Sequence, residues 1–197
     1  MRMFGCVVMV ALFAGAPAFA QEPKIEVGAG VGWARPFHGD LDFTSAAVSG
    51  TVRLRLSRLI SIEPEIAYWK NTEGETFHAG NASEVIETRS TWTFVSITAN
   101  AIVHGPAHAR ARVHGGGGPG IYYGYRRYFQ SGTATYPGLD MRRVISPTAG
   151  LQVLGGADGR LNNRLLLFGE FRLEIRSFDD PGASVARIMG GVKVPIG

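Results

Sequence analysis

The segment from Val52 to Trp69 alternates apolar and charged residues, and this two-residue period constrains the fold more than any other feature of the chain. Successive side chains leave an extended strand on opposite faces, whereas a helix repeats about every 3.6 residues. The period therefore predicts a β-hairpin with its turn at residues 57–59. In that register Arg53 lies opposite Glu63 and Arg55 lies diagonal to Glu63, so cross-strand ion pairs can form.

The same alternation recurs along the rest of the chain. It is found in residues 27–33, 95–103, 111–123, 145–153, 165–175 and 188–196. With the hairpin, these segments predict about eight strands, each near the roughly 9 to 11 residues that cross a bilayer when tilted. Short connections are expected near residues 57–59, 104–108 and 155–162, and longer polar loops near residues 38–44, 71–88, 126–141 and 177–183. Short turns at one end and long loops at the other are typical of outer-membrane barrels.

Residues 1–20 have the order of a secretory signal peptide: Arg2, an apolar run from Met3 to Ala16, and a small-residue ending Ala18-Phe19-Ala20. A membrane anchor is the alternative, but the run is shorter than the roughly 20 apolar residues of a helical span. The mature chain is then expected to begin at Gln21 and to form one domain, residues 21–197. The single cysteine, Cys6, leaves with the signal peptide, which excludes disulfides and cysteine metal sites in the mature chain.

The charge pattern argues against nucleic-acid binding. The net charge is +4 and the 20 basic residues are mostly arginine, but they are scattered singly through strand-like segments and form no basic cluster. After residue 20 no stretch is apolar enough for a membrane helix, so contact with lipid would have to be made by strands.

If the apolar rows face hydrocarbon, the charged rows must line an interior where they pair, because an unpaired buried charge costs on the order of several kcal/mol. The sequence therefore predicts an all-β fold, an eight-stranded antiparallel up-and-down transmembrane β-barrel whose lumen is filled by ion pairs. Side chains fill the lumen at this strand number, so no solute pore is expected. The predicted lumen residues are Arg53, Arg55, Glu63, Glu65, Arg110, Arg112, Glu170, Arg172, Glu174, Arg176 and Arg187, together with Glu26 and Lys193.

Aromatic residues gather at the long-loop end of the predicted strands, as expected for a membrane–water interface. The predicted interface residues are Trp33, Tyr68, Trp69, Trp92, Tyr122, Tyr123 and Tyr125. The short-turn end has no comparable belt.

With its strand rhythm, loop asymmetry, aromatic belt and signal peptide, the mature chain resembles the small outer-membrane β-barrel domain family, which includes OmpA-type and OmpX-type barrels. It departs from the family at its end, Val194-Pro195-Ile196-Gly197, where such barrels usually carry an aromatic residue read by the assembly machinery. The resemblance implies a porin-like, monomeric protein of the outer membrane of a Gram-negative-type cell. It also implies a non-enzymatic structural or surface-interaction role, with outer-membrane lipid, lipopolysaccharide and the assembly machinery as partners.

Four arginines, Arg126, Arg127, Arg142 and Arg143, bracket the third long loop beside several tyrosines. The planar guanidinium suits phosphate, so these residues are candidates to contact lipopolysaccharide. A solvated loop base is the alternative.

Other motifs predict neither a cofactor nor a metal site. GAGVGW (residues 28–33) has Trp33 where a dinucleotide loop needs its third glycine, and GGGGPG (residues 115–120) lacks the Lys-Ser/Thr ending of a phosphate loop. Those glycines are expected where a small barrel has no room for a side chain. Two histidine sets, His38 with Asp40 and Asp42, and His104 with His108, each lack a third or fourth zinc ligand.

Two other functions stay open at this stage. A lipid A acyl hydrolase or transferase would need a nucleophile, a base and an acid brought together, with candidates among His38, His78, His114, Ser83, Ser90 and Glu87. A soluble periplasmic barrel that binds a hydrophobic ligand would have the apolar and charged faces exchanged.

Overall fold

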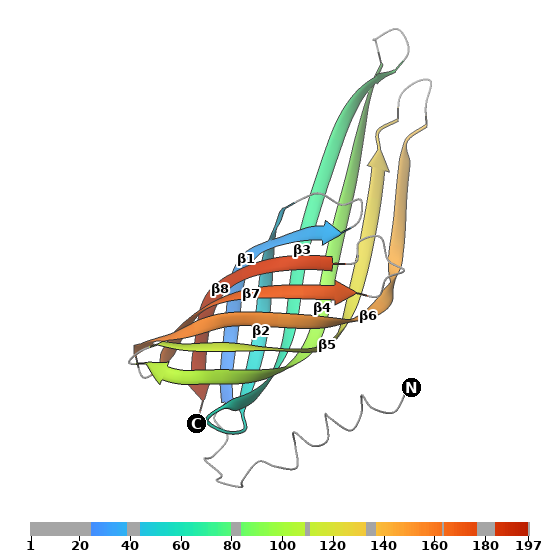
Figure 1. The fold of residues 1–197 in the computed structure, drawn as a ribbon. Helices are drawn as coiled ribbons and strands as arrows, with labels where there is room; N and C mark the ends of the chain where they lie inside the picture. Colours follow the sequence, from blue (N-terminus) through green and yellow to red (C-terminus); the bar gives the residue numbers. More distant parts are fainter. Residues whose placement is uncertain are drawn as a thin grey trace, which may run out of the picture.

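The computed structural model describes residues 25–38, 44–79, 84–108, 111–132, 137–162, 164–176 and 184–196. These residues form a closed barrel of eight antiparallel strands in which each strand pairs with its sequence neighbours and β8 closes onto β1 (Figure 1). The strands are β1 (Ile25–His38), β2 (Ser45–Arg55), β3 (Ile60–Ala79), β4 (Glu84–His108), β5 (Ala111–Gln130), β6 (Leu139–Asn162), β7 (Leu165–Arg176) and β8 (Ser184–Ile196). The predicted eight-stranded up-and-down barrel is confirmed. The predicted signal peptide lies outside the described residues.

Within the described ranges, no helix has the length and apolar character needed to cross a membrane.

The strands have two very different lengths. β3, β4, β5 and β6 contain 20 to 25 residues, whereas β1, β2, β7 and β8 contain 11 to 14. The extra length projects beyond one end of the barrel, here called the ribbon end (Figure 1). The opposite end, where β2 and β3, β4 and β5, and β6 and β7 are joined, is called the turn end. The projecting sheet is defined as residues 70–79, 84–93, 125–130 and 139–144.

The projecting sheet corrects the prediction of long loops at residues 71–88 and 126–141. Gly74 pairs with Arg89, and Tyr128 pairs with Met141, so both segments are mostly paired strand. The short connections predicted at residues 104–108 and 155–162 were also too long, because β4 continues to His108 and β6 continues to Asn162. A sheet with both faces outside the bilayer needs no apolar row, so the two-residue alternation that reveals the barrel strands is missing from it.

The barrel has an apolar exterior and a charged interior. Val31, Val103 and Ile188 on the outside are 61–67% exposed, whereas Arg53 and Arg172 on the inside are fully buried. Water around such an exterior would leave a continuous apolar surface unburied, so the outer face must meet hydrocarbon and the strands cross a bilayer. The alternative of a soluble barrel with an apolar interior is therefore wrong.

The opening hairpin has the predicted register. Leu54 pairs with Ile62 across β2 and β3, and Arg53 Nε lies 2.6 Å from Glu63 Oε2. Apolar side chains leave this hairpin toward the bilayer, and its charged side chains leave toward the lumen.

The glycine-rich segment of β5 lies where neighbouring strands approach closely. A Cβ atom at Gly118 would lie 1.8 Å from the carbonyl oxygen of Ala99, and one at Gly116 would lie 2.0 Å from that of Ala101. These backbone contacts leave no room for any other residue, which confirms the structural explanation of the GGGGPG segment.

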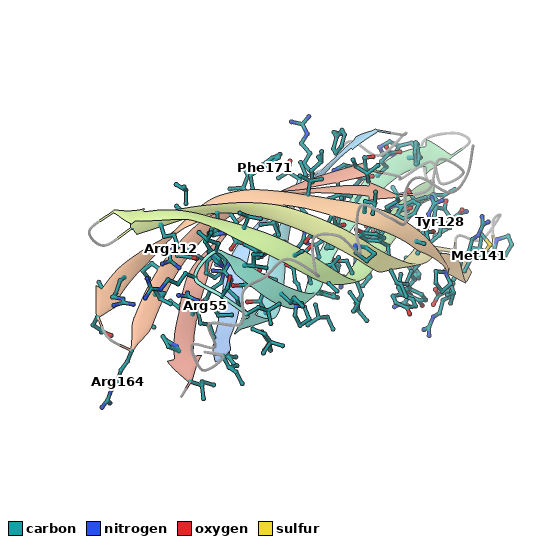
Figure 2. The ribbon with its side chains drawn as sticks, turned by 60° about the horizontal axis from the view of Figure 1, so that its bottom comes forward. Arg55, Arg112, Tyr128, Met141, Arg164 and Phe171 are labelled. Atoms are coloured by element: carbon teal, nitrogen blue, oxygen red, sulfur yellow. The ribbon has the colours of Figure 1, made fainter. Side chains whose placement is uncertain are left out.

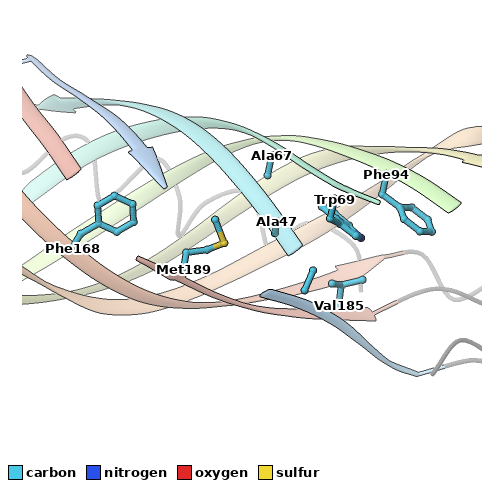
Figure 3. Packing of buried hydrophobic residues seen from close by; sticks show 8 residues of the cluster. Ala47, Ala67, Trp69, Phe94, Phe168, Val185 and Met189 are labelled. Atoms are coloured by element: carbon cyan, nitrogen blue, oxygen red, sulfur yellow. The ribbon is translucent and has the colours of Figure 1, made fainter. Parts of the chain in front are cut away.

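An apolar layer fills the lumen toward the ribbon end (Figure 3). It consists of Ala34, Ala47, Ala67, Trp69, Phe94, Phe168, Val185 and Met189, with Trp92 packed against it. Trp69 stacks on Phe94 with ring centroids 5.6 Å apart. Most of these residues lie toward the ribbon end, but Phe168 lies among the charged side chains nearer the turn end, where Lys193 Nζ is 4.5 Å from its ring centroid.

Candidate functional sites in the lumen and on the projecting sheet

Arg172, on the inward face of β7, is the centre of the lumen network. Its Nη1 lies 2.5 Å from Glu65 Oε2 and its Nη2 lies 3.0 Å from Glu63 Oε1, while Nη2 also donates to Glu170. The side chains of all four residues are fully buried, and they come from β3 and β7 on different sides of the barrel. A buried arginine in contact with three carboxylates ties distant strands together.

A second set of contacts surrounds Arg53 nearer the turn end. Arg53 Nη1 lies 2.5 Å from Asp158 Oδ2, and its Nε donates to Glu63. Lys193 Nζ on β8 lies 2.8 Å from Glu170 Oε1 and 3.2 Å from Glu63 Oε2. Each carboxylate is therefore shared by two or more cations, which makes the network continuous around the lumen.

Toward the ribbon end the charges meet the aromatic layer. Arg187 binds Glu65 through both terminal nitrogens at 3.1 Å, and its Nη2 lies 2.7 Å from Glu174. The Arg176 guanidinium lies 5.0 Å from the ring centroid of Tyr122 and 5.1 Å from that of Phe94. Such stacking is favourable for a desolvated arginine.

The paired charges of the described lumen balance, while Arg112 faces the lumen as one further cation that has no ion pair among the described residues. The buried cations are Arg53, Arg172, Arg176, Arg187 and Lys193, to which the partly exposed Arg55 is added through its contact with Glu26. The buried carboxylates are Glu26, Glu63, Glu65, Asp158, Glu170 and Glu174. A balanced and paired interior is what a low-dielectric lumen requires.

The predicted lumen residues thus meet as expected, with three exceptions. Arg55 Nη2 pairs with Glu26 Oε1 at 2.5 Å and not with Glu63. Arg112 faces the lumen opposite Asp158, but it forms no ion pair with any other residue that the structure describes. Arg110 lies outside the described residues. Arg55 and Arg112 both lie at the turn end, which comes forward in Figure 2.

Two histidines and an aspartate converge in the lumen at the turn end. His104 on β4 is the direct cross-strand partner of His114 on β5, and Asp158 comes from the adjacent strand β6. One potential ligand atom from each of the three residues lies within 4.8 Å of the other two, and all three residues are buried. The sequence paired His104 with His108 because the turn was placed at residues 104–108. In the structure β4 continues to His108 and β5 begins at Ala111, and this register sets His104 opposite His114.

Ser61 adds a fourth polar group, with its Oγ 2.7 Å from His104 Nε2. A serine, a histidine and a nearby aspartate are the residue types of a hydrolytic triad. However, Ser61 is fully buried inside the lumen, so an acyl chain in the surrounding bilayer does not reach its hydroxyl. Of the other candidates, His78 and Ser90 lie on opposite faces of the projecting sheet, while Ser83 and the side chain of His38 lie outside the described residues.

The predicted interface aromatics divide between the two faces of the barrel. Trp33, Tyr68 and Tyr123 are 41–65% exposed on the exterior, as expected for a lipid interface, and Tyr125 is partly buried. Trp69 and Tyr122 are buried in the lumen, and Trp92 packs against the lumen cluster, so their assignment to the interface is wrong. In the sequence, all three residues alternate in step with the charged residues, which point into the lumen. The height of a residue along the barrel does not determine whether its side chain points inward or outward.

The four arginines of the predicted lipopolysaccharide site also divide by face. Arg127 pairs with Arg142 across β5 and β6, and Arg126 pairs with Arg143. Cross-strand partners share a face, and adjacent residues lie on opposite faces. Arg126 lies 4.5 Å from the ring centroid of Trp92, which places the Arg126–Arg143 pair on the lumen side of the projecting sheet. Arg127 and Arg142 are on the side continuous with the barrel exterior.

Two further basic residues share that outer side. Lys70 pairs with Thr93, which in turn pairs with Tyr125, and Arg89 pairs with Phe129. Lys70, Arg89 and Arg142 are exposed. The outer side of the projecting sheet therefore carries a row of basic residues just beyond the membrane-spanning strands.

Two acidic residues share this side: Glu87, which is exposed and lies two residues from Arg89 on β4, and Asp140, which pairs with Arg127. Arg127 Nε and Nη2 donate to Asp140 Oδ1 and Oδ2 at 3.0 and 2.8 Å. These hydrogen bonds and the guanidinium charge hold the pKa of Asp140 below its ordinary value, and they raise the pKa of Arg127. The pair is exposed, so its contribution to folding is small. Arg89 and Arg142 are exposed and form no ion pair with another residue that the structure describes.

The sequence is matched by no protein-family model and by no curated protein. Three solved structures of outer-membrane proteins resemble it in fold. The Ail protein of Yersinia pestis, in complex with the heparin analogue sucrose octasulfate, is 12% identical, covers 89% of this chain and 100% of its own, and has a TM-score of 0.60. A major outer membrane protein of Thermus thermophilus is also 12% identical, with the same coverage and a TM-score of 0.58. Neisserial surface protein A is 15% identical, covers 87% of this chain and 96% of its own, and has a TM-score of 0.53.

At these identities the likeness concerns the fold alone. Together with the apolar exterior and the charged lumen, it leads to one conclusion: the chain has the fold of the small eight-stranded transmembrane β-barrels of the outer membrane.

Proposed function

We propose that this chain is a monomeric, non-enzymatic outer-membrane protein whose barrel is an anchor and whose projecting sheet is a surface for interaction. The observation that carries this proposal is the unequal strand length. Four strands continue well past the barrel wall, and they present paired backbone and mixed polar side chains beyond the bilayer. A barrel that served only as a structural element would need no such extension.

The packing of side chains in the lumen supports a role that does not involve transport through the barrel. Its charged and aromatic side chains form continuous contacts from the turn end to the ribbon end, and a lumen filled in this way favours a plug over a channel. The assembly machinery is the expected partner during insertion. β8 closes the barrel by pairing with β1 as far as Ile196, even though this strand ends without an aromatic residue.

Cysteine labelling on intact cells tests the proposed orientation. The only natural cysteine, Cys6, lies in the predicted signal peptide, so single cysteines can be introduced without background in the mature chain. Thr76→Cys on the projecting sheet is expected to react with a membrane-impermeant maleimide on intact cells. Leu59→Cys, which is 58% exposed at the turn end, is expected to react only after the outer membrane is opened. The reverse pattern would contradict the proposal.

We further propose that the basic row on the outer side of the projecting sheet binds lipopolysaccharide phosphates. The row lies next to the part of the barrel that meets lipid, and arginine binds phosphate through two parallel hydrogen bonds. A barrel of similar fold, Ail, has been solved with a highly sulfated sugar, so the architecture is compatible with an anionic saccharide ligand.

Two adjacent arginines supply a matched test, because Arg142 lies on the outer side of the sheet and Arg143 on the lumen side. Arg142→Glu combined with Arg89→Glu is expected to weaken the binding of purified lipopolysaccharide to the folded barrel in detergent, and to make the remaining binding less sensitive to salt. Arg126→Glu combined with Arg143→Glu has the same charge change on the other face and should leave binding near the wild-type level. Equal losses in both variants, or none, would refute a face-specific site.

A further inference from the structure

We propose that the turn end of the lumen binds one late transition-metal ion, of the zinc or copper class, through His104, His114 and Asp158. The three side chains come from adjacent strands β4, β5 and β6, and their potential ligand atoms lie within 4.8 Å of one another. Imidazole nitrogens with one carboxylate oxygen are the ligands that such ions prefer, whereas magnesium and calcium prefer oxygen alone.

The hydrogen bonds of the two histidines leave one nitrogen of each ring for a metal. His104 Nε2 lies 2.7 Å from Ser61 Oγ, and His114 Nε2 lies 3.1 Å from Glu170 Oε1. A ring that donates from Nε2 to these oxygens carries its lone pair on Nδ1. A metal-binding histidine usually donates the N–H of its other ring nitrogen to an acceptor such as a carboxylate, a backbone carbonyl or a water.

The atoms that remain are buried and lack hydrogen-bond partners among the described residues. They are His104 Nδ1, His114 Nδ1 and Asp158 Oδ1, of which Asp158 Oδ1 lies 3.6 Å from Lys193 Nζ in an ion pair without a hydrogen bond. Asp158 Oδ2 is held by Arg53 and lies 3.3 Å from His114 Nδ1. The three residues are 1%, 6% and 6% exposed. Each such atom costs on the order of 1–3 kcal/mol if it stays unsatisfied, and in these three residues the atoms that lack a hydrogen bond are all potential metal ligands close to one another. An ion bound between them would satisfy all three together.

The present spacing suits a site that closes on its ion. With metal–ligand bonds of about 2.0 Å, tetrahedral ligand atoms lie roughly 3.3 Å apart, so the three side chains would draw together when the ion binds. The His104 and His114 ring centroids are 6.0 Å apart and their planes are inclined by 58°, which allows both rings to turn toward a common point.

The charges around the three side chains indicate which kind of fourth ligand the ion would have. Because the paired cations and carboxylates of the lumen already balance and Arg112 adds a further positive charge, a divalent ion adds charge that the protein does not offset. We therefore expect an exogenous anion, chloride or hydroxide, in the fourth position. Arg112 lies opposite Asp158 in the β5–β6 register, and its buried Nη1 has no hydrogen-bond partner in the described structure. That nitrogen is well placed to hold such an anion.

Cobalt(II) titration of the purified full chain, folded in detergent and without a histidine tag, tests the proposal. Tetrahedral cobalt has a characteristic visible absorption, and zinc should displace it. The expected result is one cobalt ion per barrel, with the absorption abolished by His104→Gln or His114→Gln and retained in His78→Gln, which changes an exposed histidine of the projecting sheet. Ser61→Ala removes an outer partner and should weaken binding by about tenfold.

Two results would overturn the metal site. One is a folded wild-type barrel that gives no cobalt absorption, and the other is absorption that survives in both histidine variants. If a variant fails to fold on an unboiled gel, X-ray absorption of the zinc-loaded wild-type protein decides instead, with two imidazoles expected around the ion. Fewer than two would refute the assignment.

Discussion

Arginine has opposite roles in the barrel and in the projecting sheet. Inside the barrel, Arg172 is fully buried and contacts Glu63, Glu65 and Glu170. On the projecting sheet, Arg127 binds a single carboxylate while its side chain is 46% exposed. Both residues lie on extended strands whose side chains alternate between two faces, so the medium around each face decides what the charge does.

The comparison shows that the contribution of an ion pair to the free energy of unfolding depends on whether the pair is buried or exposed. A buried charge has already lost its hydration, so removing its partner leaves an uncompensated charge in a medium of low dielectric. When an exposed pair is broken, water hydrates the remaining charge, so the free energy of unfolding changes little. Breaking a pair inside the barrel is therefore expected to destabilise the fold, whereas breaking the Arg127–Asp140 pair on the projecting sheet is expected to have little effect.

The largest expected effect that separates the two regions comes from Arg172→Met. The substitution leaves three buried carboxylates short of a cation and should lower the free energy of unfolding by about 3–5 kcal/mol. Urea unfolding of the barrel in lipid vesicles measures this change. Arg142→Met, the same substitution on the exposed sheet, should leave the unfolding midpoint unchanged.

A second substitution sharpens the test of the lumen. Glu170→Gln added to Arg172→Met removes one uncompensated charge, so it should recover part of the lost stability. If the single variant is as stable as the wild type, the lumen network does not stabilise the fold and the contrast between the two regions fails.

A smaller effect is expected from the close packing of the barrel wall. Gly118→Ala places a Cβ atom against the carbonyl oxygen of Ala99, which forces the strands apart and should cost about 1–3 kcal/mol. Gly169→Ala is the matched control, because a Cβ atom there meets nothing within 4 Å. The same unfolding experiment compares the two, and equal stabilities would show that β5 can move away from β4.

The smallest effect concerns the pH dependence of the exposed pair. The hydrogen bonds and charge of Arg127 hold the pKa of Asp140 below its ordinary value of 3.8. A lowered carboxyl pKa means that the pair stabilises the sheet above pH 3.8 and that this contribution is lost as the pH falls through the folded value. Carbon NMR of the Asp140 carboxyl group should record this low pKa, and Arg127→Gln should return it toward 3.8. A wild-type pKa at or above 3.8 would contradict the pairing.

Much of the barrel was predictable because alternation is a local property of extended chain. The Arg53–Glu63 register, the eight strands and the inward charged row follow from which residues lie two apart. Strand ends were not predictable in the same way. β6 runs on through Asp158, where glycines and polar residues resemble a turn, and its pairing with β7 through Phe168 keeps it extended.

The candidate metal site was missed for the same reason. Asp158 was assigned to a connection, and His104 was grouped with a neighbour in sequence, when its partner is His114 across the hairpin. Trp69 and Tyr122 were misplaced although their alternation phase was the one expected of lumen residues. In that case the information was in the sequence, and grouping the aromatics by their level along the strand hid it.

The sequence by itself determined that the chain forms strands with one apolar and one charged face, because side-chain direction along a strand depends only on position in the chain. Only the tertiary structure decided which charges share a partner, how far the strands extend beyond the barrel, and which histidines meet. Those features depend on register around a closed barrel, where residues more than 100 positions apart, such as Arg172 and Glu65, come within hydrogen-bonding distance.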